Sequence, residues 1–332
     1  MSEAIDGDLE DWADLSYMEW PTLLLGNGLS INLWSGFLYD SLYTSAPLAP
    51  EAQAIFTELG TTNFEQCLEC LHHANIALHA LHESTNKVDE TYAQVRDALF
   101  ETVREVHVPW GIFPQASHDL LAETMNGHKA VFTTSYDLCL YWSHQQTEKL
   151  VNIVDFFWGS GHRFDDADTL VRNPSATRVH YLHGGLHLWQ DDSTGENGKW
   201  TTADGSLLSS QSKYGPTSTR RPLFVSEGTS AAKSRTIRQS NYLTFCLSEL
   251  RSNDRPTVLF GQSLAAQDAH ISEALNEGSN RRIAVSMYPT GDVNAIIEEK
   301  ARILKGLPNH TVRFFDSTTH PLGNVTLQIS KS

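Results

Sequence analysis

The chain is short of several features that mark common protein classes. Its 332 residues include only four cysteines, too few for a disulfide framework, and no apolar run is long enough to span a bilayer. The acidic N-terminal segment has neither the basic region nor the apolar stretch of a secretory signal. We therefore expect a cytoplasmic protein that has no contact with a membrane.

Positive charge is missing from the first quarter of the chain. Residues 1–86 contain no Lys or Arg but thirteen Asp or Glu, and the net charge of the whole chain is −16. A protein devoted to nucleic-acid binding needs a basic face, so we expect no dominant binding of nucleic acid. The acidic stretch is either a solvated surface or a docking surface for a basic partner or a neighbouring subunit. Cations gather instead in residues 211–238, which hold six Lys or Arg and one Glu.

Apolar runs and helical periods alternate along the chain. The runs typical of strands lie at 22–25, 129–134, 151–157, 178–183, 222–226, 256–261, 282–287 and 311–315. Helical periods lie at 62–83, 88–107, 117–126, 138–148, 266–277 and 292–305. This alternation predicts an α/β fold with a doubly wound, mostly parallel, Rossmann-like sheet.

We expect residues 1–330 to form one domain, with a helical insertion at 50–127 after the first strand. Residues 190–200 and 203–221 are rich in Ser, Thr, Gly and Asp, which predicts two long surface loops.

A glycine-rich turn follows the first apolar run, where a strand would lead into a helix. Glycines let the backbone approach a phosphate, and the N–H groups of a helix N-terminus attract it. The residues that we assign to such a cofactor contact are Gly26, Asn27, Gly28 and Ser30. A tight turn without a ligand is the alternative. Ile31 stands where the dinucleotide fingerprint of hydride-transfer enzymes needs a third glycine, so that fingerprint is not met.

Small hydroxyl-bearing residues and a carboxylate follow the apolar run at 129–134. Such residues at the end of a strand are unusual for packing alone. Asp137 can accept a hydrogen bond from a carboxamide or a ribose hydroxyl, and Thr133 and Ser135 add hydroxyl groups. The alternative is that Ser135 or Asp137 caps the next helix.

His183 follows another apolar run and precedes two glycines. These small neighbours predict that its imidazole is exposed to a cleft, where it can act as a general base near neutral pH. His180 and His187 lie nearby and raise the alternative of a local metal site. Neither the i,i+4 spacing of a helical ligand pair nor a cysteine accompanies them, so we expect no metal.

A second turn with a glycine and a hydroxyl follows the run at 256–261, and we assign its Gly261 and Ser263 to cofactor binding. A dinucleotide lies across the two halves of a doubly wound sheet, so two such turns are what it needs.

Together these four segments resemble the sirtuin-like NAD-binding fold over about residues 20–290. In that family a G-[AN]-G-x-S turn, a T-T-N-Y-D strand end, a His-Gly pair and a late G-x-S-L turn occur in this order. The chain looks most like bacterial sirtuin-like proteins close to the NAD-hydrolysing effectors of antiphage defence. The resemblance implies that His183 is the base, that Asp137 contacts the carboxamide, and that Ser135 occupies the position of the catalytic Asn.

Two departures from the family pattern refine the expectation. The paired C-x-x-C motifs of the deacetylase zinc ribbon are absent, since Cys67 and Cys70 form the only such motif. Position 135 holds Ser, which is shorter than Asn and lacks the amide. The expected function is therefore NAD glycohydrolysis with NAD as substrate. The partners that the resemblance implies are further copies of the chain and an ATPase of a defence system. The alternatives are a non-catalytic sensor of NAD or ADP-ribose and a nicotinamide oxidoreductase, which the missing third glycine disfavours.

Overall fold

The computed structural model describes residues 5–168, 173–202, 206–214 and 217–329. The ends of the predicted domain and parts of the predicted loop at 203–221 lie outside these residues. Among the described helices, none combines the length and the apolar character needed to cross a bilayer.

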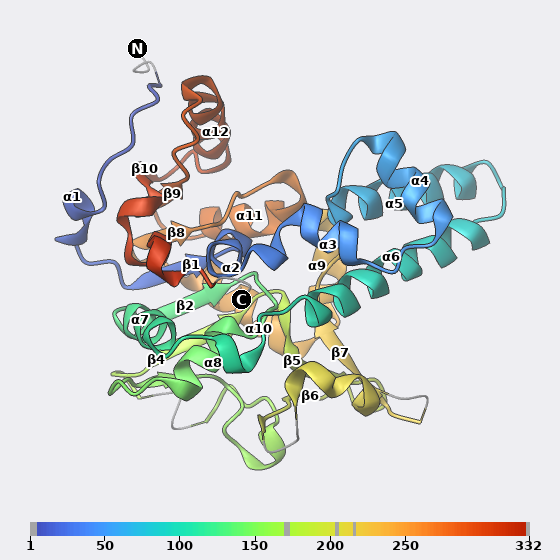
Figure 1. Ribbon diagram of the computed structural model, residues 1–332, viewed down its shortest axis with the longest axis horizontal. Coiled ribbons are helices and arrows are strands. Elements are labelled where there is room, and N and C mark those ends of the chain that lie inside the picture. The colour runs from blue at the N-terminus through green and yellow to red at the C-terminus, as the bar shows by residue number, and fades with distance from the viewer. Residues whose placement is uncertain (1–4, 169–172, 203–205, 215–216, 330–332) are drawn as a thin grey trace.

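A seven-stranded sheet forms the centre of the protein (Figure 1). Its strands are β1 (Thr22–Leu25), β2 (Ala130–Thr133), β3 (Ile153–Val154), β4 (Thr177–Tyr181), β8 (Thr257–Phe260), β9 (Arg282–Met287) and β10 (Thr311–Asp316). Their order is β10-β9-β8-β1-β2-β4-β3, and every pair is parallel. The predicted doubly wound, Rossmann-like sheet is confirmed. The chain passes from one side of β1 to the other between β4 and β8, which makes the β1/β8 boundary the topological switch point.

Helices flank this sheet. They are α1 (Ala13–Ser16), α2 (Asn27–Leu33), α7 (Gln115–Asn126), α8 (Cys139–Gln146), α9 (Ser230–Arg238), α10 (Asn241–Ser252), α11 (Ala269–Glu277) and α12 (Val293–Gly306). Side chains cap several of these helices. Thr229 accepts from the backbone N–H of Ala232 at the start of α9, and Ser240 accepts from the backbone N–H of Leu243 at the start of α10. Each such cap satisfies a backbone donor that has no partner inside the helix.

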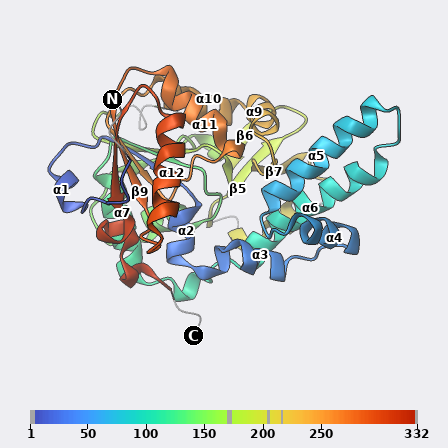
Figure 2. The same ribbon diagram turned by 90° about the horizontal axis from the view of Figure 1, so that it is seen from above.

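Helices follow the first strand, as predicted, but their range differs from the predicted 50–127, because α7 flanks the sheet and the insertion begins with α3 (Tyr39–Ser45). The insertion also contains α4 (Pro50–Leu59), α5 (Phe64–Ala80) and α6 (Asn86–Glu105). Asn63 caps α5, because its side chain accepts from the backbone N–H of Glu65 at 2.9 Å. Figures 1 and 2 show the α5–α6 hairpin projecting from the body, while the start of α5 stays close to the sheet.

A second, antiparallel sheet corrects the prediction of a surface loop at 190–200. It consists of β5 (Gly184–Asp191), β6 (Asn197–Lys199) and β7 (Arg220–Phe224), in the order β6-β5-β7. Every residue from 184 to 190 is buried, so β5 has no alternation of apolar and polar side chains by which to recognise it. Lys199 is buried as well, because its ammonium lies 2.6 Å from the Asp155 carboxylate.

Candidate functional site

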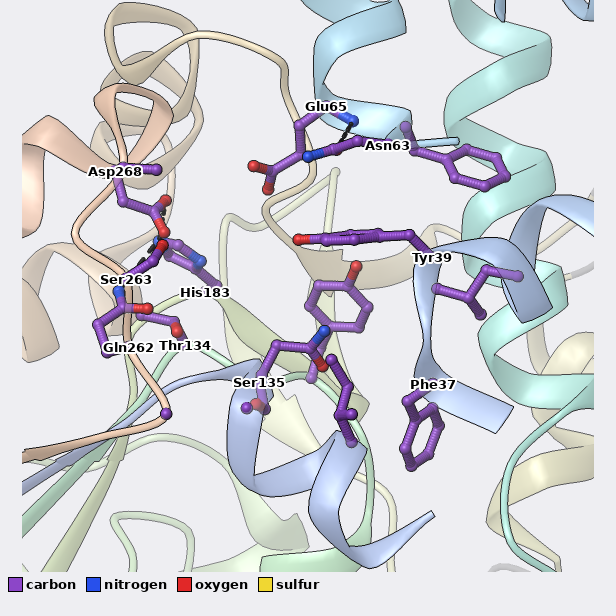
Figure 3. A pocket seen from close by; sticks show the side chains of 18 of the residues that line it. Phe37, Tyr39, Asn63, Glu65, Thr134, Ser135, His183, Gln262, Ser263 and Asp268 are labelled. Atoms are coloured by element: carbon purple, nitrogen blue, oxygen red, sulfur yellow. Dashed lines mark hydrogen bonds and ion pairs between the residues drawn. The ribbon is translucent and has the colours of Figure 1, made fainter. Parts of the chain in front are cut away.

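A cavity of about 380 Å³ opens at the carboxyl ends of the central strands (Figure 3). It is lined by Asn27, Gly28, Ile31, Phe37, Tyr39, Leu42, Asn63, Phe64, Glu65, Leu99, Val103, Thr134, Ser135, Tyr136, Asp137, His183, Gly261, Gln262, Ser263, Ala265, Gln267 and Asp268. The segments after β1, β2, β4 and β8 thus share one cavity at the topological switch point. The insertion forms the remaining wall, chiefly through α3, α5 and α6.

The two glycine turns pack directly against each other. The backbone N–H of Gly28 donates to the Gly261 carbonyl oxygen at 2.9 Å. A Cβ atom on Gly26 would lie 2.4 Å from the same oxygen, and one on Gly261 would lie 2.6 Å from the Leu29 nitrogen. Gly261 also has a φ of +66°, a region that L-residues with a side chain rarely adopt. The glycines therefore allow the chains after β1 and β8 to meet at the cavity wall.

We expect Gly261→Ala to lower the free energy of unfolding by about 1–3 kcal/mol, because its methyl group would be forced against backbone at a positive φ. Gly159→Ala is the matched control: Gly159 has a φ of −66° and no atom within 4 Å of its Cβ direction. Urea titration of the two variants measures the difference. Equal urea midpoints for the two variants would show that the contact between the two glycine turns does not contribute to stability.

Side chains from α2 and from the segment after β2 bond to one another at the cavity wall. The Ser30 hydroxyl donates to Asp137 Oδ2 at 2.5 Å, and the Ser30 and Ser135 oxygens lie 3.1 Å apart. Asp137 Oδ1 accepts from the backbone N–H of Cys139 at 2.8 Å, at the start of α8. Asp137 is not the N-cap of α8, which is Leu138, but it bonds to the first N–H of that helix and also lines the cavity.

His183 lines the cavity but is only 3% exposed, so the prediction that it is exposed to a cleft is wrong. Its glycine neighbours are themselves buried in β5, and its Nε2 lies 2.9 Å from Nε2 of His270. One of these two nitrogens must donate and the other accept. Burial holds the pKa of His183 well below its ordinary value, and the nearby Asp268 carboxylate opposes that shift. The imidazole is therefore neutral, as a general base must be.

A buried lysine connects the two sides of the cavity. Lys233 Nζ lies 2.6 Å from Glu65 Oε1, on the insertion, and 2.7 Å from Asp268 Oδ1, which follows β8. The Lys233 side chain is completely buried, whereas Glu65 and Asp268 line the cavity. Burial alone would lower the pKa of the Lys233 ammonium, but the two carboxylates outweigh it and raise the pKa above its usual range.

Three groups near Lys233 have shifted pKa values. Burial would raise the pKa of Asp268, yet the Lys233 ammonium outweighs it and lowers the pKa to about 2. Burial lowers the pKa of His270 to about 4, against the pull of the Asp268 carboxylate. Burial raises the pKa of Glu65, and Lys233 opposes the rise.

The low pKa of His270 predicts a dependence of stability on pH. His270 stays neutral in the folded chain down to about pH 4, whereas an unfolded histidine has its ordinary pKa of 6.5. The unfolded chain therefore binds more protons in this window, and stability falls as the pH drops from 6.5 to 4. We expect His270→Asn to flatten this loss, by up to about 1.4 kcal/mol per pH unit. Denaturant titrations between pH 4 and 7.5 measure it, and parallel curves for parent and variant would contradict the assignment.

The cavity contains seven of the residues that the sequence singled out. These are Asn27, Gly28, Ser135, Asp137, His183, Gly261 and Ser263. Gly26, Ser30 and Thr133 lie behind the wall instead: Gly26 faces Gly261, Ser30 bonds to Asp137, and Thr133 Oγ1 accepts from the Ser135 backbone N–H.

The histidines considered for a local metal site lie apart from the cavity. His180 stacks on Phe132, and His187 stacks on Tyr141. A different group, His183, Asp268 and His270, brings three potential ligand atoms within 4.8 Å of one another. The Lys233 ammonium already bonds to the Asp268 carboxylate, so this carboxylate has a cationic partner within the protein.

Sequence reasoning missed the groups that complete the site. Glu65 lies in the acidic stretch 1–86, Asp268 in the predicted helix 266–277 and Lys233 in the basic segment 211–238, and no sequence motif connects them. Arg220 of the same segment stacks on Trp189, and Arg221 pairs with Asp192 at 2.5 Å, both on the antiparallel sheet. The excess of carboxylates in residues 1–86 was the one available signal that a buried cation must come from elsewhere.

Comparison with known families gives one match. The model of a family described as a domain of unknown function (DUF4917) matches residues 23–322, which include every strand of the central sheet but the first residue of β1. No curated protein matches the chain.

Proposed function

The chain belongs to the DUF4917 family, and we propose that this member is an NAD glycohydrolase. The observation that carries the proposal is that one cavity at the topological switch point gathers the segments following β1, β2, β4 and β8. Open α/β sheets bind their ligands at this place. A cavity of about 380 Å³ lies in the range of small-molecule sites.

The proposed reaction cleaves the bond between nicotinamide and ribose. The carbon–nitrogen bond breaks, its electron pair stays on the ring nitrogen, and neutral nicotinamide leaves. Water adds to the ribose carbon and gives up a proton, which neutral His183 accepts. The products are nicotinamide and ADP-ribose, and no oxidant or second substrate is needed.

Phosphate binding would rest on backbone groups. None of the described residues that line the cavity is Lys or Arg. The start of α2 at Asn27 and the turn at Gly261–Ser263 meet at the wall. The N–H groups of Gly28 and Gly261 already donate within the protein, so the N–H groups of Asn27 and Ser263 and the Ser263 hydroxyl are the donors proposed for the phosphate. The sirtuin-like resemblance of these segments supports NAD as the ligand.

The test is to incubate the purified full-length chain with NAD in chelator and to quantify nicotinamide and ADP-ribose by chromatography. Release of both in equal amounts supports the proposal. Binding of NAD without release favours the alternative, a sensor of NAD or ADP-ribose. One observation favours that alternative: the hydroxyl of Ser135 and the carboxylate of Asp137 already bond through Ser30, so both are partly occupied before a ligand arrives.

The physiological setting follows from the resemblance alone. It supports depletion of NAD on phage infection, with activity controlled by assembly with further copies of the chain or with a partner ATPase. Four free cysteines fit a reducing compartment such as the cytoplasm, where NAD is available. Adding the product of a neighbouring gene to the nicotinamide assay tests the control by a partner.

A further inference from the structure

We propose that Glu65 and Asp268, bridged by Lys233, form a subsite for a positively charged ring. In the function proposed above, on which this step rests, that ring is the pyridinium of NAD. The insertion would then supply part of the substrate site, and the sheet would supply the rest.

Negative charge around the cavity is the first observation that supports the subsite. Glu65, Asp137 and Asp268 line it, and no Lys or Arg among the described residues does so. Lys233 pairs with Glu65 and Asp268 from behind, so these two carboxylates and one ammonium leave a net charge of −1. A buried excess charge is unfavourable unless an opposite charge comes close. A cationic ligand in the cavity would supply it.

The orientation of the carboxylates is the second such observation. Figure 3 shows Glu65 pointing across the cavity toward Asp268 and His183. Lys233 contacts only Oε1 of Glu65, and Oε2 makes no hydrogen bond within the described part of the chain. Both bonds from Lys233 are short, at 2.6 and 2.7 Å, so the two carboxylates are fixed before a ligand binds. Such fixed groups stabilise a charge without reorganising.

Aromatic rings give the same region a surface for a flat cation. Tyr39 lies next to Glu65 in Figure 3, and Phe37 and Tyr136 line the same cavity. A cation over an aromatic face gains a further attraction that a neutral ring of the same shape lacks. A pyridinium ring therefore fits this wall better than a phosphate does.

The subsite also suits the chemistry. When the bond between ring and ribose breaks, the positive charge moves from the ring nitrogen to the ribose carbon. Carboxylates beside that bond attract the charge in both positions, as the paired carboxylates of glycoside hydrolases do. Glu65 and Asp268 would thus bind the ring and stabilise the ribosyl cation.

Two ring compounds test the subsite without any turnover. 1-Methylnicotinamide carries the pyridinium charge, and nicotinamide has the same carboxamide ring without it. In ligand-observed NMR titrations of the full-length chain, we expect the cation to bind at least about tenfold more tightly. Glu65→Gln keeps the shape but removes a charge and should reduce that ratio about tenfold, whereas Glu65→Asp should preserve most of it. Glu58→Gln is the matched control, because it makes the same change at an exposed glutamate of α4.

Three outcomes overturn the proposal. They are equal binding of the two compounds by the parent, an unchanged ratio in a Glu65→Gln variant with parental circular dichroism, and loss of cation binding in chelator, which would assign the site to a metal ion. Turnover of NAD is read separately. Hydrolysis of NAD without a preference for the charged ring contradicts the proposed subsite but supports the proposed enzyme. A preference for the charged ring without hydrolysis supports the subsite but contradicts the proposed enzyme.

Discussion

His183→Ala is expected to reduce nicotinamide release from NAD by about 100- to 10,000-fold, the usual cost of losing a general base. The His183 imidazole lines the cavity. Its Nε2 bonds to Nε2 of His270, whereas Nδ1 of His183 makes no hydrogen bond within the described residues. No other described histidine lines the cavity. Initial rates at saturating NAD, with the affinity for NAD measured in parallel, separate a lost base from lost binding.

The burial of His183 makes a stability control necessary. The alanine variant leaves Nε2 of buried His270 without a partner, which typically costs about 1–3 kcal/mol. A second variant, His183→Asn, keeps a polar group there but supplies no base, and it should be equally inactive. His79→Ala removes an exposed histidine of α5 and should keep parental activity. Near-parental turnover in the folded His183→Ala variant would remove this residue from the mechanism.

Ser135→Asn is expected to act in the opposite direction and to raise NAD hydrolysis about 100- to 1,000-fold, the usual worth of one oriented polar contact in a transition state. Ser135 lines the cavity, and its hydroxyl lies 3.1 Å from that of Ser30. An Asn side chain reaches further and offers both a donor and an acceptor. It can hold a ribose hydroxyl and position water at once. Nicotinamide release from matched amounts of parent and variant measures the gain.

The outcome of Ser135→Asn also chooses between the two proposed functions. An inert parent that becomes active establishes the glycohydrolase lineage. An inert parent and an inert variant that both bind NAD make the sensor the better hypothesis. A parent that is already fast shows that Ser135 is competent and that the Asn carried over from the family is not needed here. Ser252→Asn, an exposed change at the end of α10, controls for nonspecific effects of the substitution.

The sequence predicted the central sheet well because its strands are buried on both faces. Leu23, Val131 and Val258 are all completely buried, and the runs around them are uniformly apolar. The helical insertion was equally clear because one face of α6 is apolar at the helical period. In the antiparallel sheet, the run at 222–226 predicted β7, but β5 and β6 were missed. β5 contains glycine, histidine, tryptophan and glutamine, a mixture that no simple period describes.

The site was predictable only where it depends on the ends of strands. Parallel strands deliver their carboxyl ends to one edge, so Ser135, His183 and Gly261 could be brought together from the sequence alone. Glu65 and Lys233 are 168 positions apart, and each belongs to a helix whose docking depends on tertiary packing. A histidine with two glycine neighbours looks exposed in sequence, and only the fold shows that His270 covers it.

The bond between Lys233 and Glu65 limits how this chain can change over evolution. If the start of α5 were lost or displaced, a fully buried ammonium would keep only one of its two carboxylates, at a cost that is typically several kcal/mol. The far end of the α5–α6 hairpin is under no such constraint, because Leu81 and Glu83 there are exposed. Insertions and deletions should therefore be tolerated at the tip of the hairpin, whereas substitutions in the first turn of α5 should be tolerated only together with compensating changes in α9.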